Sequence, residues 1–174
     1  VDLAQYGMAL PIVAGIDALQ AILAPRQANA GVEIFERFVA DADGQGVMFE
    51  VETVYTGSNA DYHRRSTLGQ RDEDLSRRYA EFYRKRYGEL EVLSAPTLHN
   101  DIDRNELRVR ERYRLKSPFQ TQSGGVRMLE AYADALDGAS ALPESISRNG
   151  PLDYGARGRY RHEVSVTFPE RWKP

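Results

Sequence analysis

Four arginines occupy alternate positions of one short segment and form the most prominent charge feature of the chain. They are Arg108, Arg110, Arg112 and Arg114. Residues two apart in a strand project from the same face, so a strand here presents four guanidinium groups together. Such a row can bind an anionic or carbohydrate ligand. The alternative is a solvated face that pairs across strands with carboxylates. The candidate partners are Glu50, Glu52, Glu89 and Glu91.

Residues for covalent or acid–base catalysis are sparse. The chain has no cysteine, which excludes disulfides, thiolate metal sites and a cysteine nucleophile. His63, His99 and His162 are widely separated and lack the paired spacing of a zinc-binding helix. His99 lies near Asp101, but no nucleophile accompanies them. The sequence therefore predicts no catalytic residue, no metal ligand and no cofactor, and a hydrolase using His99 or distant carboxylates is the enzyme alternative.

One segment resembles a calcium-binding loop in its spacing. Asp41, Asp43 and Glu52 fall at positions 1, 3 and 12 of such a loop, and Gly46 falls at position 6. Position 5 is Gln45 instead of Asp or Asn, and the flanking residues favour strands where a calcium loop needs helices. The Asp and Gly residues suit a turn that requires positive φ, so we expect a β-hairpin here.

Length and composition limit the class of protein. The chain has 174 residues, with 23 Lys plus Arg against 26 Asp plus Glu and a net charge of −3. This length suits one domain, or one domain with an appendage. The near-neutral balance argues against a nucleic-acid partner, and Tyr113, the one aromatic residue between the arginines, falls on the opposite face of the strand. No apolar run reaches the roughly 18 residues that a membrane span needs.

Hydrophobic periodicity predicts the elements that position these residues. Alternation predicts strands at 32–40, 47–56, 106–115 and 162–168, with weaker strands at 89–94 and 97–99. A helical period predicts helices at 72–87 and 126–136 and a short helix beginning near Asp17. The 72–87 helix has acidic residues in its first turn and basic residues in its last, as the helix dipole favours. Its apolar stripe is Leu75, Tyr79, Phe82, Tyr83 and Arg86.

These elements predict an α+β fold. We expect an antiparallel sheet built from residues 32–56, 89–115 and 162–168, with the 72–87 helix packed across one face because its aromatic stripe must be buried. A β-sandwich with helical insertions is the alternative. The expected core consists of Phe35, Phe49, Val51, Leu75, Tyr79, Phe82, Leu107, Val109, Tyr113, Val164 and Val166.

A series of short motifs, taken in chain order, resembles one protein family. The series begins with Tyr6-Gly-x-Ala9-Leu10, Tyr55-Thr-Gly57, Ala60-Asp61 with Arg64, and Tyr83-Arg-Lys-Arg-Tyr87-Gly88. It continues with Asn100-Asp-x-Asp-x-Asn105-Glu-Leu-x-Val109 and Glu111-x-Tyr113-x-Leu115. It ends with Arg148-x-Gly-Pro151-Leu152 and Val164-x-Val-x-Phe168-Pro-Glu-x-Trp172. The series resembles the region that follows the catalytic core of large bacterial transglutaminase-like proteins, in which domains of unknown function flank that core.

The resemblance implies an accessory role without catalysis. A transglutaminase-like core uses a Cys-His-Asp triad, and this chain has no cysteine to carry that machinery. Because the chain starts at Val1 and stops just past a strand-like segment, we expect it to be a piece of a larger protein. Its implied partners are the adjacent domains of that protein, and the family suggests a periplasmic or cell-surface location.

The expected organisation has three parts. Residues 1–31 resemble the end of the core and a linker, residues 32–138 form the accessory domain, and residues 139–174 lead towards a further C-terminal domain.

Overall fold

A computed structural model of the chain describes residues 8–21, 30–140, 158–170 and 172. The strands are β1 (Met8–Ala9), β2 (Gln20–Ala21), β3 (Gly31–Ala40), β4 (Val47–Thr56), β5 (Leu90–Asp101), β6 (Glu106–Leu115), β7 (Gln120–Thr121), β8 (Arg127–Met128) and β9 (Arg159–Thr167). The helices are α1 (Ser58–Thr67), α2 (Asp72–Tyr87) and α3 (Asp134–Ser140). The predicted motifs at 6–7 and 148–152 lie outside the described residues.

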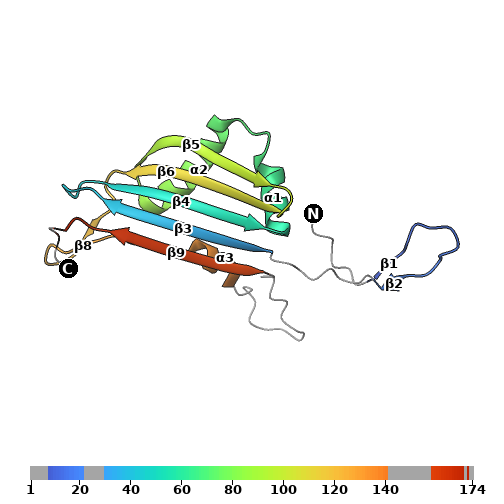
Figure 1. Cartoon of the computed structure of the whole chain (residues 1–174). Coiled ribbons are helices and arrows are strands. Elements are labelled where there is room, and N and C mark those ends of the chain that lie inside the picture. The colour runs from blue at the N-terminus through green and yellow to red at the C-terminus, as the bar shows by residue number, and fades with distance from the viewer. Residues whose placement is uncertain (1–7, 22–29, 141–157, 171, 173–174) are drawn as a thin grey trace.

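Five strands form one twisted sheet in the order β5-β6-β4-β3-β9 (Figure 1). The pairs are antiparallel except for β3 and β9, which run parallel at one edge. Two short pairs, β1–β2 and β7–β8, stand apart from this sheet. The predicted α+β class, with a mainly antiparallel sheet, is confirmed.

The segment between β3 and β4 is a hairpin turn, as predicted, and its flanking strands exclude the helix–loop–helix context of a calcium loop. The Asp41 amide donates to the Gly46 carbonyl at 2.9 Å, and the Gly44 amide donates to the Asp41 carbonyl at 2.9 Å. Gly44 has a φ of +73°, and a Cβ there would lie 2.6 Å from the ring of Trp172. Backbone freedom and close approach both require glycine at this position.

The three helices of the described chain lie on one face of the sheet, which we call the helix face; the other is the open face. On the helix face, Tyr83 and Tyr87 of α2 pack on Phe49 of β4, with ring centroids 4.9 and 5.2 Å apart. Phe49 also stacks on Phe38 at 4.5 Å. The prediction that the 72–87 helix buries aromatic residues against a sheet is confirmed.

Part of the predicted core is wrong. Phe35 lies on the open face, and the Arg161 guanidinium lies 5.0 Å from its ring centre. Alternate residues of β3 point to opposite faces, and the residue that points to the helix face here is the buried Glu36. Phe82 is 42% exposed because it lies on the flank of α2, whereas Tyr83 faces the sheet. Val164 and Val166 are 38% and 41% exposed because they lie on the edge strand β9. Tyr79 is only half-buried.

Two helix predictions need correction, and one helix was missed. The 126–136 helix is wrong, because Arg127 and Met128 form β8 and the helix α3 begins only at Asp134. The short helix near Asp17 is also wrong, since Gln20 and Ala21 form β2. Helix α1 was not predicted, because its ten residues carry no apolar stripe. No helix in the described ranges has the length and apolar character that a membrane span needs.

Candidate functional site

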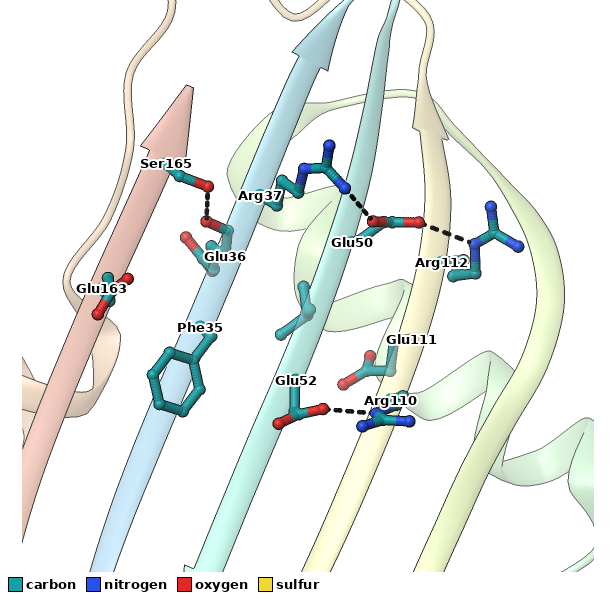
Figure 2. Close-up of a pocket in the computed structure, with 11 residues that line it drawn as sticks. Phe35, Glu36, Arg37, Glu50, Glu52, Arg110, Glu111, Arg112, Glu163 and Ser165 are labelled. Atoms are coloured by element: carbon teal, nitrogen blue, oxygen red, sulfur yellow. Dashed lines mark hydrogen bonds and ion pairs between the residues drawn. The ribbon is translucent and has the colours of Figure 1, made fainter. Parts of the chain in front are cut away.

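The four predicted arginines lie side by side on the open face, each within reach of a carboxylate. Glu52 of β4 accepts hydrogen bonds from both Arg108 and Arg110. Glu50 lies between Arg112 at 3.1 Å and Arg37 of β3 at 3.5 Å, as Figure 2 shows. The strand register causes this pattern, because Glu50 and Glu52 stand directly opposite Arg112 and Arg110.

The fourth arginine of the row, Arg114, pairs with Asp41 at the hairpin turn. The predicted cross-strand pairing of the arginines with Glu50 and Glu52 is therefore confirmed. None of the ion pairs found for the four arginines in the described residues involves Glu89 or Glu91. Glu89 instead forms an ion pair with Lys116 at 2.7 Å.

A shallow groove of about 420 Å³ crosses the middle of the open face. Phe35, Glu52 and Arg110 line its floor and sides, and Glu163 and Ser165 of β9 line its far end (Figure 2). The side chains of Arg110 and Arg112 are 63% and 54% exposed. Since each positive group already has a carboxylate beside it, the face carries mixed charge, which suits a protein surface better than a polyanion.

A second polar cluster joins residues from the separate motifs that carry the family resemblance. Arg64 of α1 donates to Asp61 at 2.9 Å, to Asn100 of β5 at 2.7 Å and to the side chain of Asn105 at 2.9 Å. Asn105 also holds Gly57, since its side-chain amide donates to the Gly57 carbonyl at 3.2 Å. The cluster therefore ties the start of α1 to the β5–β6 turn.

Two glutamates are buried on the helix face among the core side chains. The Tyr113 hydroxyl donates to Glu111 at 2.6 Å, and burial raises the pKa of Glu111 to about 7. Oε2 of Glu36 lies 3.3 Å from Nε2 of His162, and both side chains are 1% exposed. Burial, with the nearby carboxylates of Asp134 and Glu111, raises the pKa of Glu36 to about 8.

Burial also shifts the titration of His162, the partner of Glu36. Burial lowers the pKa of its imidazole, more strongly than Asp134 raises it. The Ala135 amide at the start of α3 donates to Nδ1 at 3.5 Å, whereas Nε2 of His162 and Oε2 of Glu36 are buried and form no hydrogen bond within the described residues. The pair of Glu36 and His162 was not predicted from the sequence. A signal was present, because Glu36 and Glu111 each lie among the alternate strand positions whose other residues are mostly apolar.

We expect Glu36→Gln to stabilise the protein at alkaline pH and to leave its stability unchanged at acid pH. An unfolded glutamate ionises near 4.5, whereas the pKa of Glu36 in the folded protein is about 8. The stability that its bound proton provides is therefore complete below about pH 4.5 and is lost as the pH rises through about 8, at up to about 1.4 kcal/mol per pH unit. Glutamine carries no titrating proton. Urea unfolding from about pH 5 to about pH 9 measures the difference.

Glu50→Gln is the control for this prediction, because Glu50 lies on the open face with a side chain that is 32% exposed. Because this variant keeps Glu36, it should still lose stability as the pH rises towards about 8. The contrary outcome is that Glu36→Gln and the original protein lose the same free energy of unfolding as the pH rises. Glu36 would then not retain its proton in the folded state.

The three histidines do not come together. His99 is exposed on β5 opposite Arg108, on the open face, whereas His63 and His162 lie on the helix face. His63 stacks on Tyr55 at 3.7 Å, and burial, helped by the charge of Arg78, lowers its pKa to about 4. Within the described ranges, no group of three or more His, Asp or Glu residues is placed to hold a metal ion.

Comparisons with protein-family models, with curated proteins and with solved structures found no match to this chain.

Proposed function

We propose that this chain is a non-catalytic interaction domain and that it serves as an accessory part of a larger, transglutaminase-like protein. The observation that carries the proposal is the open face: the helices of the described chain leave it uncovered, and its ion pairs span β3, β4 and β6. An open face with ordered, paired charges provides specificity for a protein partner through complementary charge.

The polar cluster around Arg64 supports the same proposal. The motifs that resemble the family supply Gly57, Asp61, Arg64, Asn100 and Asn105, and these residues are joined by hydrogen bonds to one another. Their role is to hold the framework that presents the open face. The domain contributes shape and a binding surface, and the bond-making step belongs to another part of the parent protein.

The test uses the purified chain and the separately produced remainder of its parent protein. We expect binding by titration calorimetry, and we expect Arg110→Glu/Arg112→Glu to weaken it about tenfold or more, because two ion pairs become repulsive contacts. The matched control is Arg71→Glu/Arg77→Glu. These are exposed arginines near the start of α2 that pair with Asp74, away from the open face.

Two outcomes contradict the proposal. The first is transfer of a primary amine to a glutamine peptide by the chain alone, which would make the chain an enzyme. The second is an affinity for the remainder of the parent that the open-face variant leaves unchanged and the α2 control abolishes.

An anionic or carbohydrate ligand is the second candidate function, and the groove beside Arg110 and Arg112 is the observation that favours it. This function predicts salt-sensitive retention of the original chain on heparin resin, lost in Arg110→Glu/Arg112→Glu. Because the arginines already have carboxylate partners, we expect the original chain to pass through the resin at physiological salt.

A further inference from the structure

The two edges of the main sheet differ in how they are protected from pairing with another strand. Edge strands expose unpaired backbone groups, and proteins usually block them with proline, bulges or inward charge. The β5 edge carries Pro96 and two register irregularities, between Val92 and Ser94 and between Ser94 and Thr97. That edge is therefore poorly shaped to accept a further strand.

The β9 edge has none of these devices within its strand. Its residues contain no proline or glycine, and β9 pairs with β3 in an unbroken register from Arg159 to Thr167. Figure 1 shows β9 as the last strand of the sheet, and none of the described strands pairs with its outer side.

Apolar side chains are exposed along the same edge. Val164 and Val166 point to the helix face, yet they remain 38% and 41% exposed, and Phe168 just beyond them is 50% exposed. Helix α3 covers His162 in the first half of β9, and α2 packs on the same face but towards the other edge of the sheet, beside β5. The second half of β9 therefore offers both backbone groups and apolar surface.

The charged residues of β9 indicate which strand could pair with its outer side. Arg161 and Glu163 lie on the open face and form an ion pair along the strand. If two copies of β9 pair antiparallel about His162, Arg161 of each copy stands opposite Glu163 of the other. The four charges then alternate in sign. On the helix face, the same register places Tyr160 opposite Val164, an aromatic and β-branched pair of the kind that stabilises sheets.

Neighbouring registers are less favourable. A slip of one residue would place the helix face of one copy beside the open face of the other. A slip of two residues places Arg161 opposite Arg161 in one direction and Glu163 opposite Glu163 in the other, and like charges directly opposite one another destabilise a strand pair. Charge therefore favours the register centred on His162 over its neighbours.

We infer that β9 is a self-association edge, through which a second copy of this chain pairs antiparallel about His162 and extends the five-stranded sheet across a two-fold axis. The occupant is a copy of the same chain because β9 is complementary to itself in charge and in side-chain size. The inference does not depend on the proposed function, since it uses the edge of the sheet and not the open face of β4 and β6.

Sedimentation velocity and light scattering on the full 174-residue chain test this inference. We expect a concentration-dependent dimer with twice the 19.7 kDa chain mass. Val164→Lys places a lysine at the edge and should leave a folded monomer. The matched control is Leu93→Lys, because Leu93 is 40% exposed on the protected β5 edge, and this variant should dimerise like the original chain.

Charge exchange tests the register. Arg161→Glu alone or Glu163→Arg alone places like charges opposite each other twice per dimer, and we expect each to weaken dimerisation about tenfold or more. The double variant Arg161→Glu/Glu163→Arg restores the alternation of sign and should dimerise like the original chain. These exposed positions leave the core intact, so the exchange remains decisive if Val164→Lys fails to fold.

A monomer at every concentration would overturn the inference. A dimer that survives Val164→Lys in a folded protein, or that is indifferent to the single charge reversals, would also overturn it.

Discussion

Phe49→Ala is expected to lower the free energy of unfolding by about 4 kcal/mol. Phe49 is completely buried at the centre of the helix face. Its ring contacts the rings of Phe38, Tyr83, Tyr87 and Tyr113 at centroid distances of 4.5 to 6.1 Å. Alanine removes these contacts and leaves a cavity that the strand and the helix cannot close, because both are fixed by their own backbone hydrogen bonds. Urea denaturation monitored by circular dichroism measures the loss.

Phe35→Ala is the matched control, since the two residues are phenylalanines on neighbouring strands and opposite faces. Phe35 is partly exposed on the open face, with the Arg161 guanidinium 5.0 Å from its ring centre, so its loss should cost about 1 kcal/mol. Equal losses at the two positions would mean that α2 does not pack on the sheet as the structure describes.

Elements with strong periodicity were predicted from the sequence because their signal is local. The 72–87 helix is found with its predicted bounds, and the 106–115 strand is found with Leu107, Val109 and Tyr113 buried. The period states which residues share a face. It does not state how far a neighbouring element extends over that face, which is why Val164 and Val166 were assigned to the core and are exposed.

Position at the edge of a sheet is a property of topology that no local pattern carries. β9 pairs with β3 across more than a hundred residues of chain, and its alternation looks the same as that of a central strand. The weak strands at 89–94 and 97–99 are likewise one element, β5, whose bulges interrupt the period that sequence analysis needs.

The candidate site was predicted in part. The shared face of the four arginines follows from strand geometry, and Glu50 and Glu52 were among the expected partners because they share a face of the neighbouring predicted strand. Which acids pair with which arginines depends on the register between β4 and β6, and the sequence does not state that register. The link between Arg64 and Asn100 was not predicted because the two residues are 36 positions apart.

That link leads to the second large effect: Arg64→Met is expected to lower the free energy of unfolding by about 3 kcal/mol. The side chains of Arg64 and Asp61 are only 15% and 10% exposed, so removal of the guanidinium leaves a buried carboxylate without its cation. Asn100 and Asn105 lose a donor in the same step. Thermal unfolding and urea unfolding both report the change.

Arg64 and its neighbour Arg65 provide an internal comparison. Arg65 is exposed on the same helix, so Arg65→Met should change the free energy of unfolding by no more than about 0.5 kcal/mol. Arg64→Met/Asp61→Asn removes both charges, and it should recover part of the stability that Arg64→Met loses, because the uncompensated carboxylate is the larger cost. If Arg64→Met is as mild as Arg65→Met, the cluster does not stabilise the position of α1, and the packing of Ala60 and His63 on the sheet is enough to hold this helix.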